Sequence, residues 1–153
     1  MGNRLQGVFF YSLESAIKSY RRFAQARIEQ SGLDVTIDQW LVLKTIQESP
    51  EASQQEVAAA VFKDFASVTR IIQLLESKSY VRRRAHRTDG RRSSLRLTRA
   101  GMALIRDLEP IIRANRRQAV RGLKASDLKR MREMLAVITT NCRPQQNIIK
   151  GAG

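Results

Sequence analysis

The chain has 153 residues, of which 42% are hydrophobic and 27% charged, a composition that fits one folded domain over 1–153 and excludes a disordered chain. Its 28 Lys and Arg residues against 14 Asp and Glu residues give a formal net charge of +14. No run of residues resembles a membrane span or a signal peptide, and the single Cys142 excludes an internal disulfide, so we expect a cytoplasmic protein with no membrane partner.

The N-terminal segment is predicted to form one long amphipathic helix over about 4–31. Apolar residues from Leu5 to Ile28 recur at steps of three and four, which is the spacing of one helix face. Gly32 follows closely and is a typical helix stop. A second helix begins at the capping box Thr36-x-x-Gln39. It ends by Ser49-Pro50, because the residue before a proline avoids the helical region.

The next two helices are expected to form a helix-turn-helix. A second capping box, Ser53-x-x-Glu56, opens a short helix that runs to Val61. Asp64 then caps a third segment that reaches about Ser77. Only two residues separate these helices, which is too little chain for an antiparallel pair with much room between them.

A short hairpin and two further helices complete the expected fold. Segments 80–84 and 95–97 are typical of short strands, with a turn at 88–91, so the hairpin forms a wing and the winged helix-turn-helix covers about 33–100. Thr98 caps a long helix that reaches about Gly122, with a break or kink near Pro110. A last helix spans about 126–140. The predicted class is mainly α with a small β-wing (α+β), flanked by long helices at both ends.

The helix after Asp64 has two different faces. Its buried face is predicted to hold Val68, Ile71, Ile72 and Leu75, which fall within one arc. The opposite side holds the candidate DNA-binding residues Ala66, Ser67, Thr69, Arg70, Gln73 and Ser77. Small side chains let a helix approach the bases closely, Arg can bond guanine and Gln can bond adenine. The amides at the start of this helix also form a candidate phosphate site.

The hairpin region is the most basic part of the chain. Eight arginines and one acid, Asp89, lie between Arg82 and Arg99. Arg is the side chain that enters narrow minor grooves and makes forked phosphate contacts. So many like charges on a short projecting hairpin repel one another unless a polyanion is nearby, so we expect double-stranded DNA as partner. The candidate wing contacts are Arg84, Arg87, Asp89, Arg91 and Arg92.

Three motifs resemble those of the multiple-antibiotic-resistance regulator (MarR) family. They are Gln39-Trp40, then Ser67-Val68-Thr69-Arg70 with Leu75-Glu76, then Asp89-x-Arg91-x-x-x-Leu95-x-Leu97-Thr98-x-x-Gly101. The resemblance covers roughly Leu5 to Thr140. Two positions depart from the family pattern. Leu74 stands where the family often has a charged residue, and Ser79 stands where a glycine commonly ends the helix in a left-handed conformation.

The resemblance implies a homodimeric, sequence-specific transcription regulator. Its first and last helices (about 4–31 and 101–142) would intertwine with those of a second copy, and Asp89 would orient Arg91 at the wing tip by an ion pair. The expected dimer-interface residues are Leu5, Phe9, Leu13, Leu128, Met131, Leu135 and Ile138. We expect a repressor that binds an inverted repeat and is released by a small aromatic or phenolic effector, for which Tyr11, Tyr20, Trp40 and Phe62 are candidate lining residues.

Other classes of function are less consistent with the sequence. The single His86 has no cysteine or carboxylate at metal-ligand spacing, and no phosphate loop, HExxH motif or nucleophile elbow is present, so we expect no enzyme, metal or cofactor. Two alternatives stay open: a non-specific architectural or RNA-binding winged-helix protein, and a module that binds acidic proteins. Oxidation sensing by Cys142 is a further, weaker hypothesis.

Overall fold

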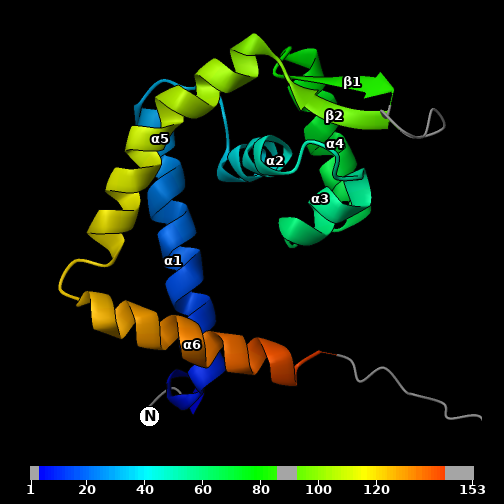
Figure 1. Ribbon diagram of the computed structural model, residues 1–153. Helices are drawn as coiled ribbons and strands as arrows, with labels where there is room; N and C mark the ends of the chain where they lie inside the picture. The colour runs from blue at the N-terminus through cyan, green and yellow to red at the C-terminus, as the bar shows by residue number, and fades with distance from the viewer. Residues whose placement is uncertain (1–3, 86–92, 144–153) are drawn as a thin grey trace, which may run out of the picture. The chain divides into compact units, whose positions relative to one another are not determined.

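The computed structural model describes residues 4–85 and 93–143 (Figure 1). The chain divides into two compact units, Met1–Ala119 and Val120–Gly153. The first unit contains, in chain order, the 3-10 helix η1 (Arg4–Gly7), α1 (Phe9–Gln30), α2 (Ile37–Glu48), α3 (Gln54–Ala60), α4 (Phe65–Ser77), β1 (Val81–Ala85), β2 (Ser93–Leu97) and α5 (Arg99–Ala119). The second contains α6 (Ala125–Asn141). The expected class, mainly helical with one two-stranded antiparallel sheet, is confirmed.

The N-terminal helix is interrupted once, which corrects the prediction of a single helix from residue 4. Val8 has extended backbone angles and separates η1 from α1. Gly7 precedes it, and glycine is a poor helix former because its backbone loses most freedom on folding. At the other end the stop is confirmed, since Gly32 has a φ of +76°.

The starts of α2 and α3 follow the sequence closely. At α2 the Gln39 amide donates to the Thr36 hydroxyl over 3.2 Å, and the Gln39 side chain accepts from the Thr36 amide over 3.3 Å. The same reciprocal pair joins Ser53 and Glu56 at α3, at 3.2 and 2.7 Å. Each box satisfies two amides that a helix start leaves without a partner.

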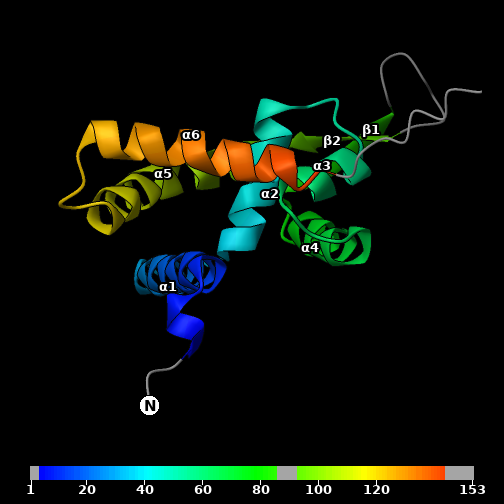
Figure 2. The same ribbon diagram turned by 90° about the horizontal axis from the view of Figure 1, so that it is seen from below.

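The core of the first unit lies around α2. In both views α2 lies between α1 and the α3–α4 pair (Figure 1 and Figure 2). Fully buried or nearly buried side chains from all five α-helices of this unit meet there, among them Ile28, Val42, Leu43, Ile46, Val57, Val68, Ile72, Leu75, Leu108 and Ile112. Burial of each such side chain contributes about 1.5–3 kcal/mol, so this cluster is the main source of the unit's stability.

The hairpin joins α5 through a tight corner. The strands pair antiparallel with Val81 opposite Leu97. The Thr98 hydroxyl donates to the Ser79 carbonyl over 2.6 Å and accepts from the Gly101 amide over 3.0 Å, so Thr98 caps α5 as predicted. The Thr98 amide in turn donates to the Tyr80 carbonyl over 3.0 Å. Ser79 has a φ of +59°, the left-handed conformation that a glycine would adopt more easily.

The first of the two C-terminal helices contains a proline. Helix α5 continues through Pro110 and ends at Ala119, so of the two predicted outcomes the helix does not break, and Figure 1 shows that it changes direction along its length. Proline removes one backbone hydrogen bond, which bends a helix without ending it when both halves are packed. Gly122, with a φ of +92°, follows α5, and α6 comes next. Within the described ranges, no helix is long and apolar enough to cross a membrane.

We expect Gly101→Ala to destabilise the fold. An added Cβ would lie 2.2 Å from the Tyr80 carbonyl oxygen, a backbone atom that must then shift. The cost of overpacking is about 1–3 kcal/mol, which exceeds the gain of about 1 kcal/mol for replacing a helical glycine by alanine. Urea denaturation measures the difference. The control is Gly7→Ala, whose Cβ meets nothing within 4 Å. Equal stability of Gly101→Ala and the parent would contradict the close packing of this corner.

Candidate nucleic-acid interface

Helix α4 presents a polar face because its apolar face is buried. Val68, Ile72 and Leu75 have no exposed surface, and Ile71 is partly buried, as the sequence predicted. The rotation of the helix is therefore fixed by the core, which places four candidate residues on the surface and two at its edge. Ala66, Arg70, Gln73 and Ser77 are exposed, and Ser67 and Thr69 are half-buried. Their role in binding DNA stays a prediction.

The hydroxyl groups on this face are already engaged with the protein. Ser67 donates to Asp64 over 2.6 Å, Thr69 to the Phe65 carbonyl over 2.8 Å, and Ser77 to the Leu74 carbonyl over 2.8 Å. Arg70 and Gln73 make no side-chain hydrogen bond to another residue of the described ranges. These two side chains are thus the ones whose donors and acceptors are available to a ligand.

The start of α4 is less suited to a phosphate than the sequence indicated. The Ser67 amide donates to the Asp64 carboxylate over 2.8 Å. The Ser67 hydroxyl and amide bonds lower the pKa of Asp64, so the carboxylate is charged at neutral pH. A negative group that already caps the helix competes with a phosphate for the same amides. The proposed phosphate site at this helix start is therefore not supported.

The basic residues of the hairpin fall into two groups. Arg83 forms an ion pair with Glu76 at 3.1 Å, and Arg96 forms one with Glu51. Arg82 and Arg84 are exposed on β1. The other wing candidates, Arg87, Asp89, Arg91 and Arg92, lie outside the described residues, as do His86 and the turn at 88–91. Arginine content alone could not separate the arginines that have an acidic partner from the others.

One carboxylate joins three elements that hold the helix-turn-helix in place. Asp38, at the start of α2, forms ion pairs with Arg21 of α1 and with Lys63, at 3.0 Å, in the turn between α3 and α4. Burial by itself raises the pKa of Asp38, but the hydrogen bonds and charges of Lys63 and Arg21 outweigh it and lower the pKa below its usual value. The sequence analysis did not single out Asp38, because its partners are far away in the chain.

The turn of the helix-turn-helix exposes an aromatic residue. Phe62 is 94% exposed and has a φ of +57°. Phe62 lines none of the described pockets, and its part in an effector site stays a prediction. The turn is so short that one residue must adopt the left-handed conformation, which directs this side chain into solvent. Trp40 is instead part of the core, with the Arg116 guanidinium 5.5 Å from its ring centre.

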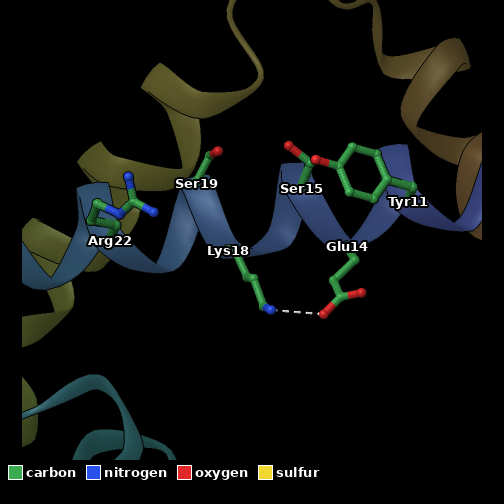
Figure 3. Close-up of a pocket in the computed structure, with 6 residues that line it drawn as sticks. All are labelled: Tyr11, Glu14, Ser15, Lys18, Ser19 and Arg22. Carbon is green, nitrogen blue, oxygen red and sulfur yellow. Dashed lines mark ion pairs between the residues drawn. The ribbon is translucent and has the colours of Figure 1, made fainter. Parts of the chain in front are cut away.

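Tyr11 lines a groove of a different kind. Figure 3 shows it on the surface of α1 with Glu14, Ser15, Lys18, Ser19 and Arg22, all from the same helix. Glu14 and Lys18 form an ion pair at 2.8 Å there. This lining is hydrophilic apart from the Tyr11 ring. The four aromatic residues proposed for an effector site do not come together in any one described pocket.

Both compact units carry exposed apolar side chains. Leu5, Phe9 and Met131 are 55%, 57% and 41% exposed, and Leu13, Leu128, Leu135 and Ile138 are half-buried. Their assignment to a dimer interface stays a prediction. The sequence analysis missed other residues of the same kind: Val8, Phe10, Ile17, Met134 and Val137. A step of three from Met131 through Met134 to Val137 is the sequence signal that could have found two of them.

Comparison with known proteins agrees with this geometry. The MarR family profile matches residues 31–92. A Listeria innocua protein of unknown function is 30% identical, with 87% of this chain and 91% of that chain covered and a TM-score of 0.66. Two further structures share the fold at lower identity. Bordetella bronchiseptica BpsR, solved in work on regulation of its DNA binding by 6-hydroxynicotinic acid, is 20% identical with a TM-score of 0.80. The match covers 91% of this chain and 98% of that chain. MepR of S. aureus in complex with DNA is 19% identical with a TM-score of 0.79. The match covers 90% of this chain and 99% of that chain.

We expect Asp38→Asn to destabilise the protein at neutral pH by about 1–2 kcal/mol, because it leaves Arg21 and Lys63 without their charged partner. The folded-state pKa of Asp38 is lowered, so its stabilisation is complete above the unfolded-state pKa and is lost as the pH falls through the folded value. The difference between variant and parent should therefore shrink in strong acid.

Urea denaturation at pH 7 and in strong acid measures the difference in unfolding free energy between variant and parent under each condition. The control is Asp34→Asn, which removes an exposed carboxylate paired with Lys78 and should change stability by less than about 1 kcal/mol. If the difference in unfolding free energy between Asp38→Asn and the parent stays constant down to the lowest pH, the ion pairs are not the cause of the destabilisation.

Proposed function

The chain belongs to the MarR family, and on this premise we propose that it is a sequence-specific double-stranded DNA-binding transcription regulator. The observation that carries the proposal is the orientation of α4. Three fully buried side chains fix its rotation, and the opposite face presents Arg70 and Gln73 with their hydrogen-bonding groups available. A helix presented in this way by a helix-turn-helix is suited to the major groove.

The two available side chains define the direct contacts that we propose. The Arg70 guanidinium matches the two acceptors of guanine, and the Gln73 amide matches the donor and acceptor of adenine. Ala66 lets the helix approach closely at its start. Ser67, Thr69 and Ser77 complete the face, with the donor of each hydroxyl already given to the protein.

The hairpin provides the second contact region in this proposal. Arg84 is exposed on β1, and Arg87, Arg91 and Arg92 follow it in the sequence. Arginines of a projecting wing favour the minor groove, where the negative potential is strongest when the groove is narrow. The carboxylate of Asp89 would orient Arg91, as the family resemblance implies.

We propose a cytoplasmic homodimer as the active form. The apolar side chains exposed on α1 and on α6 are costly in water, and a second copy of the chain would cover them. A two-fold dimer places two recognition helices on an inverted repeat with half-sites about 10 bp apart. Such a dimer on a promoter would exclude polymerase, so the proposed action is repression.

Release by a small aromatic or phenolic effector is the last part of the proposal. It is supported by the Bordetella bronchiseptica protein, whose structure was solved in work on regulation of its DNA binding by 6-hydroxynicotinic acid. An effector would act by binding preferentially to a dimer geometry that does not match the half-site spacing.

The sharpest test of the proposed function is selection of genomic fragments by the purified protein. We expect enrichment of inverted repeats, because a two-fold dimer reads each half-site in the same way. Equal recovery of all fragments would favour a non-specific architectural protein. Retention of RNA in preference to duplex DNA would favour an RNA-binding winged helix. Absence of any duplex binding at physiological salt would favour a module for acidic proteins.

Salt dependence tests the contribution of the wing. If a dimer neutralises roughly 6–10 phosphates, its affinity should fall about 10³–10⁵-fold between about 50 and 200 mM salt. Replacing Arg91 and Arg92 by Ala should weaken binding and reduce this slope. The matched control is Lys18→Ala, which removes a positive charge from the exposed surface of α1. A slope that is the same in the wing variant and the control would contradict the proposed wing contact.

A further inference from the structure

A chain of side-chain hydrogen bonds connects the wing to α4. Arg83 of β1 pairs with Glu76 of α4 at 3.1 Å and donates to the Gln54 side-chain oxygen over 3.4 Å. Gln54 stands at the start of α3, and its side-chain amide nitrogen donates to the Thr69 hydroxyl. Thr69 donates in turn to the Phe65 carbonyl over 2.8 Å. One set of contacts thus runs from the hairpin across both helices of the helix-turn-helix.

The direction of these bonds limits what Thr69 can do. A hydroxyl has one hydrogen to donate, and that of Thr69 is given to a backbone carbonyl four residues earlier. The hydroxyl cannot donate to a phosphate or to a base oxygen without breaking this bond. Because the hydroxyl oxygen is fixed between Gln54 and Phe65, the first side-chain torsion of Thr69 is fixed too, and so is the direction of its methyl group.

Gln54 can support this arrangement in only one orientation of its amide. Its oxygen accepts from Arg83, which leaves its nitrogen to donate to Thr69. With the amide turned over, the oxygen would face Thr69 and compete with the Phe65 carbonyl for the Thr69 hydrogen. The Arg83 guanidinium has donors only, so it selects the orientation that is observed. Glu76 holds the guanidinium in place.

We propose that Thr69 reads DNA through its methyl group, by contact with the methyl group of a thymine, and that Arg83 is the positioning residue that holds Thr69 in this orientation through Gln54. The inference rests on the proposed function and assigns a base to one position of the recognition helix. It also separates Arg83, which is paired with Glu76, from its exposed neighbour Arg84, which is suited to a phosphate.

The test uses a duplex from the genomic selection and copies of it in which single thymines are replaced by deoxyuridine, which removes only the methyl group. The intact protein should bind one of these copies about fourfold more weakly, the worth of one buried methyl group. Thr69→Ser keeps the hydroxyl and lacks the methyl, so it should bind the thymine and deoxyuridine duplexes equally. Thr69→Val lacks the hydroxyl, but a valine in a helix holds one preferred side-chain torsion without it, so its methyl groups stay in place and it should retain a preference for thymine.

Arg83→Ala and Arg84→Ala form a matched pair for the positioning role. Arg83→Ala should lose the thymine preference with the salt dependence of binding unchanged. Arg84→Ala should keep the preference and reduce the salt slope by about one unit. The ratio of two affinities measured on the same variant is unaffected by a loss of folded protein, so a merely structural role of Arg83 would leave it unchanged.

The possible failures are distinguishable. A protein that selects no preferred duplex overturns the proposed function, and this inference with it. A protein that selects a duplex but ignores every thymine methyl overturns this inference alone. The same conclusion holds if Thr69→Ser keeps the preference, because the methyl group of Thr69 would then not be the group that contacts the thymine. If Arg83→Ala keeps the preference for thymine, Arg83 is not the positioning residue.

Discussion

The rest of the interface depends on the burial of one side of α4. Val68, Ile72 and Leu75 are completely enclosed by the core around α2, and a rotation of the helix about its axis would expose them to water. Each of these side chains contributes about 1.5–3 kcal/mol, far more than any polar contact on the opposite face. The apolar side therefore determines which polar groups face outward, although none of the buried residues touches a ligand in the proposed function.

The positive charge of the chain acts at two levels. Part of it is matched inside the fold: Arg21 and Lys63 share Asp38, Arg83 faces Glu76, and Arg96 faces Glu51. Other positive residues, such as Arg82 and Arg84 on β1, are exposed and contribute to the long-range field of the protein. A sum of charges over the sequence does not distinguish the two, and the paired arginines belong to the architecture of the hairpin even though they lie in its most basic stretch.

Local features were predictable from the sequence, and contacts between distant segments were not. The capping boxes, the stop at Gly32 and the buried face of α4 each depend on residues within a few positions of one another, which is why their patterns were sufficient. The bond between Gln54 and Thr69, and the role of Asp38, depend on how helices cross. The exposure of Phe62 depends on a backbone angle that its residue type does not favour. The sequence left open whether Pro110 breaks or only bends its helix, because the outcome depends on packing on both sides of the missing bond.

A single residue, Thr98, stands between the last residue of β2 and the first residue of α5. Its hydroxyl and amide are bonded to the carbonyls of Ser79 and Tyr80, where α4 passes into β1. Because only this bonded residue separates them, the end of β2, the start of α5 and the corner between α4 and β1 must move together. A change in the direction of the first turn of α5 would therefore also change the orientation of the base of the hairpin.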